Sequence, residues 1–506
     1  MLRRIGIGIG SSALLQAITA LQSLALVPLF FRAWGAPQYG KWLALTAFVS
    51  YLSLFDLGGQ SYLVNVLTIQ KARKQLSELS QSFSQGVSFF LVLGGTGFFL
   101  VLGLIVSACL FPVPGLWRRL HGWEAWVLVL QSASFLIFSV PGGVYATIYR
   151  ATGLFVRGAM LGNIFRLLEL LAGAVALSLS ASPPAFAAVF LAVNSLATGV
   201  LVWDSRRCIP EACELRLSWT AAKEGWKRLG IGSLHFWSIS LARTINAQGL
   251  VLVAAAATHP AAVALYSTHR TLANIPANLG AVVQAPVLPE LSSLWAQGLS
   301  ENLQRGAMLS VRVVTWLTGI SALAILLSGP VLYPWWTGQR LTIDNTLLAI
   351  MLIQALLSAG WATAGWPMLA ANRHRGVALC SIGNALLTLL LAVWLARTGG
   401  VKGVALGSLL GDVVFGLLAV PLLLARFLNL AGAKIYAAMG IAILALLPPT
   451  VVCVLLGAVA IHWWSLAGFV ALTAAFGYPL TCLAVGRTET QNAINRLKSK
   501  LIGYRT

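Results

Sequence analysis

The sequence has little charge, and most of what it has is of one sign. Asp, Glu, Lys and Arg make up only 9% of the 506 residues, with 13 acids against 34 bases. Together with 58% hydrophobic residues and a mean hydropathy of +0.84, this composition excludes a soluble globular protein. Most of the bases are explained below by membrane orientation, so the net charge of +21 does not indicate a nucleic-acid partner.

Signatures of catalysis and cofactor binding are also missing. The six cysteines show no metal-ligand spacing, and no histidine completes a site with them. A glycine-rich segment at residues 6–10 lies in an apolar run and lacks the Lys-Ser/Thr pair of a phosphate-binding loop. We therefore expect no cofactor and no ATP site, and we predict a membrane transporter rather than an enzyme.

Long apolar runs recur along the whole chain. Lipid cannot satisfy free backbone groups, and runs this continuous do not alternate as barrel strands do, so each run predicts a transmembrane helix. The fold class is all-α and polytopic, with about 14 transmembrane helices. We expect them at residues 5–31, 39–64, 83–110, 123–149, 159–180, 185–203, 229–257, 261–287, 306–328, 346–370, 376–396, 403–425, 435–459 and 465–485.

The distribution of bases predicts the orientation. With the N-terminus inside, the cytoplasmic loops hold 23 of the 34 bases, the outer loops hold seven, and four lie within helices. This bias predicts a multi-pass protein of the inner (cytoplasmic) membrane with both termini in the cytoplasm. The first apolar run is too long for a signal peptide, so we expect it to be retained as a helix.

The spans group into two halves. Residues 149–171 align weakly with residues 369–391 through Gly162-Asn163 and Gly383-Asn384, which suggests a parallel repeat. We predict two pseudo-symmetric six-helix lobes at 1–205 and 229–425, a cytoplasmic amphipathic connector at 206–228, and two extra helices with a basic tail at 426–506. The connector carries bases opposite an apolar side, which suits the inner-leaflet surface.

The stretch from Arg32 to Asn65 is the most informative. Trp34 to Pro37 is a turn signal, and Asp56 is the single acid in the apolar run that follows. An intramembrane carboxylate is a functional candidate by default. The alternative interpretation is an acid near the membrane interface that caps a helix or pairs with Lys71 or Arg73.

This stretch resembles the second helix of Wzx-like polysaccharide and O-antigen flippases, which belong to the polysaccharide transporter family of the MOP exporter superfamily. The matching residues are Trp34, Gly35, Tyr39, Gly40, Trp42, Leu45, Tyr51, Leu52, Ser53, Leu54, Asp56, Leu57, Gly58 and Asn65. Elsewhere the resemblance is one of layout, namely helix count, two halves and basic helix interiors.

The resemblance implies a MOP/MATE-like fold and a flippase. Such proteins move an undecaprenyl-diphosphate-linked oligosaccharide from the inner to the outer leaflet by alternating access, for surface polysaccharide such as lipopolysaccharide O-antigen or exopolysaccharide. The implied partners are the polyprenyl-diphosphate-linked oligosaccharide, the lipid bilayer, and polymerase and chain-length proteins of the same pathway. Because no ATP site is expected, active transport must be driven by a gradient or a partner, and H⁺ and Na⁺ are the candidate coupling ions.

The bases within helices are the expected substrate-binding residues, because a buried guanidinium needs an anion and its fork suits a diphosphate. These residues are Arg243, Arg270, Arg312 and Arg166. Arg166 also lies three residues before Glu169 and can pair with it. Asp56 and Asp412 are the candidates for ion or proton coupling. The candidates for lining the cavity are His269, Asn246, Asn274, Tyr145, Tyr149, Trp361 and Trp366.

Two other functions remain open. A MATE-type multidrug or organic-cation antiporter would need an anionic cavity, whereas the helices here hold more arginines than acids. A membrane glycan polymerase or ligase of the same pathway would need a large outer loop with catalytic residues, and the outer loops here are short.

Overall fold

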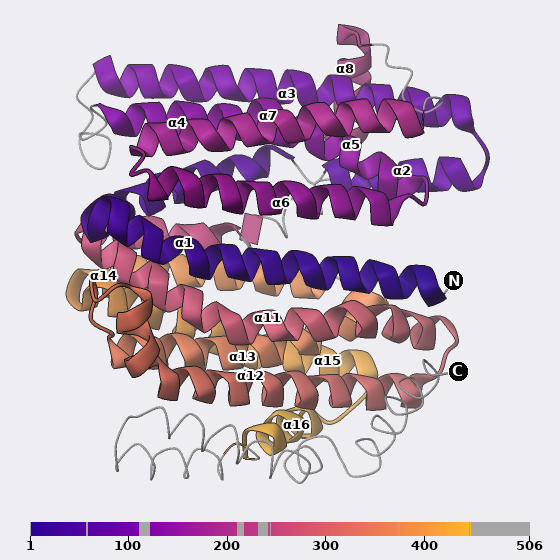
Figure 1. Cartoon of the computed structure of the whole chain (residues 1–506). Helices are drawn as coiled ribbons and strands as arrows, with labels where there is room; N and C mark the ends of the chain where they lie inside the picture. Colours follow the sequence, from indigo (N-terminus) through magenta and orange to yellow (C-terminus); the bar gives the residue numbers. More distant parts are fainter. Residues whose placement is uncertain are drawn as a thin grey trace, which may run out of the picture. The chain divides into compact units, whose positions relative to one another are not determined.

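The computed structural model describes residues 2–56, 59–110, 122–209, 217–230, 241–242, 244–371, 373, 375–444 and 446. Within these ranges every regular element is helical, and Figure 1 shows the long helices as extended rods. The first elements are α1 (Leu2–Ser50), η1 (Tyr51–Asp56), α2 (Gly59–Ala72), α3 (Leu76–Leu110), α4 (Trp123–Ala133), η3 (Ser134–Ser139), α5 (Val140–Ala151), α6 (Phe155–Ser178), α7 (Pro183–Cys208), α8 (Trp219–Gly225), η5 (Trp226–Gly230), η6 (Ile245–Gly249) and α10 (Leu250–Ala257). The later elements are α11 (Pro260–Ala296), α12 (Ser300–Trp336), α13 (Asn345–Ala370), α14 (Arg375–Gly411), η7 (Asp412–Ala419), α15 (Val420–Leu428) and α16 (Gly432–Leu444).

The described helices confirm an all-α polytopic membrane protein. Seven helical segments in the described ranges are long and apolar enough to cross a bilayer. The last of them, Arg375–Leu428, is 54 residues long and contains the two spans that the sequence predicts at 376–396 and 403–425. Gly400, with φ 53° and ψ −134°, breaks the helix between them.

The first two predicted spans differ from the structure in their boundaries. They are joined in α1, whose backbone leaves the helical region at Gly35 with φ 72° and ψ 171°. The expected turn is therefore a kink at a glycine, since this backbone conformation disfavours a side chain. The predicted span 39–64 is not one helix, because α1 ends at Ser50 and the 3₁₀ segment η1 precedes α2.

The chain divides into two compact units, residues 1–267 and 268–506. The division falls within α11, whereas the sequence places the second lobe from residue 229. Helix α10 packs against α1, which draws residues 245–257 into the first unit. The predicted lobe boundaries stay a prediction, and each unit is described by itself.

In the first unit a polar cluster of one exposed and two buried side chains joins three helices. Arg157 of α6 donates from Nε to Asp204 of α7 over 2.9 Å, and its Nη2 donates to the other carboxylate oxygen. The Tyr149 hydroxyl of α5 donates to the same carboxylate over 2.7 Å. Tyr149 and Asp204 are buried, so each polar group has a partner where water is excluded. The cluster holds α5, α6 and α7 together at one end.

In the second unit α12 and α13 pack along much of their length, and α15 and α16 complete an apolar core around Val311, Ala364, Val420 and Ile435. Parts of the prediction lie outside the described residues. These are Arg243, the end of the predicted span 435–459, the predicted span 465–485 and the basic tail.

Candidate functional site

The stretch that resembles the flippases forms an aromatic cluster in the first unit. Phe30 stacks on Tyr39 with ring centroids 4.8 Å apart, and Trp42 meets Phe186 of α7 edge-on at 5.2 Å. The Trp34 indole donates a 2.8 Å hydrogen bond to the carbonyl of Ala181 between α6 and α7. These aromatic residues of the motif therefore fix α1 against α7.

Asp56 lies at the N-terminal end of α2, where its carboxylate accepts the backbone N–H of Gln60. This contact is a helix cap, as one of the two interpretations predicts. Lys71 is in the last turn of the same helix, fifteen residues further on, so the expected alternative of pairing with Lys71 is wrong for this structure. The Asp56 Oδ1 atom is buried without a hydrogen-bond partner.

A cavity of about 690 Å³ opens beside the aromatic cluster, lined by α1, η1, α4, η3, α6 and α7. We call it the first-unit cavity. Its size falls within the range of about 300–1,000 Å³ typical of ligand sites. Its polar lining consists of amides, hydroxyls and a single ion pair, namely Gln22, Thr46, Ser50, Ser53, Gln131, Ser134, Ser139, Asn194, Arg166 and Glu169.

The wall of this cavity is irregular where its polar groups gather. Ser134 and Ser139 belong to η3, a π-helical segment between α4 and α5. Such segments are frequent at functional sites. Asn194 of α7 joins both serines, since its Nδ2 donates to Ser134 Oγ over 3.0 Å and its Oδ1 accepts from Ser139 over 3.2 Å.

Arg166 is the predicted substrate-binding base that lines this cavity. Its Nη1 atom lies 2.8 Å from Glu169 Oε2, which confirms the expected pairing along α6. Arg166 is 40% exposed and Glu169 only 11%. The charges of this pair cancel, so the described lining of the cavity has no net charge.

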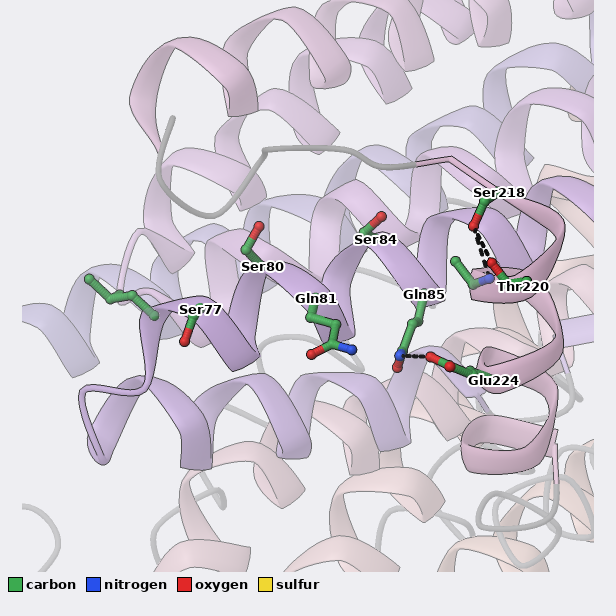
Figure 2. A pocket seen from close by; sticks show the side chains of 10 residues that line it. Ser77, Ser80, Gln81, Ser84, Gln85, Ser218, Thr220 and Glu224 are labelled. Atoms are coloured by element: carbon green, nitrogen blue, oxygen red, sulfur yellow. Dashed lines mark hydrogen bonds between the residues drawn. The ribbon is translucent and has the colours of Figure 1, made fainter.

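A second polar hollow, the α3–α8 groove, measures about 750 Å³. Figure 2 shows Ser77, Ser80, Gln81 and Ser84 following one another along α3, with the segment that begins at Ser218 at the far end of this row. Gln85 donates to Glu224, and Arg228 donates to Ser82 over 3.0 Å. Gly225 lies so close to α3 that a Cβ atom would come within 2.6 Å of the Gln85 carbonyl oxygen. The C-terminal part of the predicted connector, residues 217–228, is thus fixed to α3 by close packing and hydrogen bonds.

Asp412 is the centre of a buried polar cluster in the second unit. Asn384 Nδ2 donates to its Oδ1 over 2.7 Å, and Gln354 Nε2 donates to its Oδ2. Thr388 donates to Asn384 Oδ1 over 3.1 Å, which fixes the orientation of that amide. Asp412, Asn384 and Thr388 are at most 3% exposed. We call these four residues the Asp412 cluster.

The sequence identified Asp412 but not its partners. Asn384 was visible only as the residue that the weak repeat aligns with Asn163, and both asparagines are buried. Gln354 and Thr388 are single polar residues in apolar spans, a signal that many packed membrane helices share. The three amides of the first-unit cavity were likewise visible only as isolated polar residues.

Neither Arg270 nor Arg312 lines the first-unit cavity or belongs to the Asp412 cluster. Arg312 of α12 is half-buried, and its Nε atom is buried without a hydrogen-bond partner. Arg270 of α11 is half-buried. Arg243 is not among the described residues. A common anion site for these three arginines stays a prediction.

The residues predicted to line the cavity lie in different environments, some in the apolar cores and some exposed. Tyr145 and Tyr149 are buried in the core of the first unit and line neither the first-unit cavity nor the α3–α8 groove. Trp366 packs in the core of the second unit. The Trp361 indole lies beside the Asp412 carboxylate without a well-formed hydrogen bond. Asn274 is exposed, and the buried Asn246 Oδ1 atom has no hydrogen-bond partner.

His269 connects helices at one end of the second unit. It is fully buried, and its Nε2 atom accepts the backbone N–H of Asp344 over 3.0 Å. Asp344 caps α13 and lies 2.9 Å from the Lys402 ammonium. His269 therefore serves as a structural acceptor here, in contact with the Tyr333 ring rather than with either described hollow.

The chain matches no protein-family model and no curated protein sequence. Its fold, however, is similar to that of solved membrane transport proteins. A lipid II flippase, MurJ, in an inward closed conformation is 13% identical over 92% of this chain and 98% of that chain, with a TM-score of 0.67. An inward-facing multidrug resistance MATE family transporter of the MOP superfamily is 14% identical over 85% and 95%, with a TM-score of 0.57. A MOP superfamily transporter from Pyrococcus furiosus is 14% identical over 84% and 94%, with a TM-score of 0.51.

The fold and the buried polar sites thus define a polytopic α-helical membrane protein. At these identities the likeness establishes the fold alone, one seen in a lipid II flippase and in transporters described as members of the MOP superfamily. Nothing in the likeness identifies a substrate.

Proposed function

We propose that the protein is a flippase that moves a polyprenyl-diphosphate-linked oligosaccharide from the inner to the outer leaflet by alternating access. The observation that carries the proposal is the similarity in fold to a lipid II flippase over 92% of the chain. The match of the stretch 32–65 to Wzx-like flippases supports it independently. The cargo is an oligosaccharide for surface polysaccharide, exported with the polymerase and chain-length proteins of the same pathway.

The bases within the helices support an anionic cargo. Arg312 presents a buried guanidinium nitrogen without a protein acceptor, and a diphosphate supplies acceptor oxygens. Arg270 and Arg243 are assigned to the same task. Asp412, buried in an intramembrane polar cluster, is assigned to exchange a proton or hold Na⁺ during the transport cycle.

The test is mass spectrometry of the lipid extract from a strain that lacks the protein, compared with the same strain carrying the wild-type gene. We expect one polyprenyl-diphosphate oligosaccharide to accumulate in the deletion strain only. An unchanged lipid profile together with new sensitivity to cationic drugs would instead support a MATE-type antiporter. A shortened accumulated glycan would support a polymerase or ligase.

The same assay tests the arginines. Arg270→Ala and Arg312→Ala should each restore less export than the wild type while reaching the membrane in normal amounts. Arg305→Ala is the matched control, because Arg305 lies on α12 but is 70% exposed and paired with Glu301. Full export by the double variant of Arg270 and Arg312 would contradict a role for these arginines in diphosphate binding.

A further inference from the structure

We infer that the first-unit cavity is a sugar-binding subsite that holds an uncharged hexose or N-acetylhexosamine unit of the cargo. The inference rests on the proposed function, because it names the part of that cargo which this unit binds. The described residues that line the cavity lie between Gln22 and Asn194, all within the first compact unit.

The charge of the lining selects the class of ligand. Among the described lining residues the charged side chains are Arg166 and Glu169, and they neutralise each other at 2.8 Å. A diphosphate would need uncompensated positive charge, which this lining does not offer. A purely apolar occupant would leave the buried carboxamide oxygens of Gln22 and Gln131 without partners. An uncharged, polar ligand fits both facts.

The unused hydrogen-bonding capacity points to hydroxyl donors. Gln22 Oε1 on α1 and Gln131 Oε1 on α4 are buried acceptors without a hydrogen-bond partner. The Gln131 Nε2 atom makes one long contact, of 3.4 Å, to Thr46 Oγ1. A sugar carries several hydroxyl groups that can donate to such oxygens. The two acceptors lie on different helices, α1 and α4, and both line the cavity.

The same lining also supplies the apolar surface that a sugar ring needs. Phe30, Tyr39, Trp42 and Phe186 line the cavity and pack against one another, with Phe30 and Tyr39 stacked. Aromatic side chains combine a large apolar face with a rigid geometry. The C–H face of a pyranose can pack on this wall while its hydroxyls meet the amides.

The experiment measures binding to the full chain in lipid nanodiscs, with two classes of probe. One is undecaprenyl diphosphate, and the other is undecaprenyl diphosphate bearing a single glucose, galactose or N-acetylglucosamine. We expect at least one sugar-bearing probe to bind the wild type more tightly than the bare lipid. Gln22→Leu and Gln131→Leu should each lower that affinity by about tenfold, as expected for one lost hydrogen bond, and leave the affinity for bare undecaprenyl diphosphate unchanged.

Folding should survive both changes. The Gln22 and Gln131 carboxamide oxygens have no hydrogen-bond partner in the protein, and leucine has a similar volume. Gln81→Leu is the matched control, because Gln81 is exposed on α3 and lines the α3–α8 groove instead. This control should bind both probes as the wild type does.

The outcomes separate the two claims. Equal losses for both probes, or no loss in either glutamine variant, would overturn the sugar subsite while leaving the flippase proposal intact. The subsite also fails if the wild type binds bare and sugar-bearing lipids equally. Failure of the wild type to bind any of the lipids would overturn the proposed function itself, and the subsite with it.

Discussion

Asn384 donates a 2.7 Å hydrogen bond to Asp412, which lies 28 residues further along the same segment beyond the kink at Gly400. The two side chains meet because α14 folds back on itself there and packs against η7. The buried Asp412 carboxylate accepts hydrogen bonds from two side-chain amides, those of Asn384 and Gln354. It supplies the first prediction.

Asp412→Asn should uncouple transport from its driving ion. The new amide leaves either Asn384 or Gln354 without an acceptor, so we also expect a loss of stability of about 1–3 kcal/mol. The measurements are export as a function of pH and Na⁺ in vesicles, and thermal unfolding of the purified protein. An unchanged pH and Na⁺ dependence would remove Asp412 from the coupling mechanism.

Gly40→Ala should destabilise the first unit. A Cβ atom at Gly40 would come within 1.7 Å of the backbone carbonyl oxygen of Pro260. Because this oxygen belongs to the main chain, a change of side-chain rotamer cannot relieve the clash. Overpacking of this kind costs about 1–3 kcal/mol. Thermal unfolding should show the loss. Gly95→Ala on α3 is the control, since nothing lies within 4 Å of its added Cβ, and a similar loss there would contradict the explanation.

Arg166→Leu should destabilise the protein more than the double variant Arg166→Leu/Glu169→Leu does. The single change leaves Glu169, 11% exposed, without its partner, at a cost on the order of 1–3 kcal/mol. The double change removes both charges and should recover most of the stability, as replaced ion pairs often do. Thermal unfolding of wild type and of the single and double variants measures the coupling. Additive losses would show that the pair is not a unit.

Ionised Asp344 should stabilise the fold, so the free energy of unfolding should decrease when this carboxylate is protonated in acid. Burial tends to raise the pKa of Asp344, but the hydrogen bond from Lys402 and those from backbone amides outweigh it, so the pKa lies below its ordinary value. A depressed pKa contributes stability above the pKa of the unfolded aspartate, about 3.9, and this contribution is lost as pH falls through the folded value. Thermal unfolding between pH 6 and pH 3 should therefore show a smaller loss for Asp344→Asn than for the wild type. Equal losses would contradict the prediction.

The sequence determined the class of fold. Its apolar runs are longer than a bilayer is thick, and lipid leaves backbone groups no partner outside a helix or closed barrel, so a polytopic helical protein follows from composition alone. The ion pair of Arg166 and Glu169 was also predictable, because residues three apart on a helix share a face. Trp34 to Pro37 predicted a break, and the kink lies at Gly35.

The tertiary structure decided which polar residues meet. Asp412 finds Gln354 and Asn384 only because α13, α14 and η7 pack together, and no periodicity encodes a contact between residues 58 positions apart. Gln22, Gln131 and Asn194 line one cavity for the same reason, because the helices that carry them pack together. Helical spacing fixes neighbours along one helix, whereas packing between helices depends on the shapes of all their side chains at once.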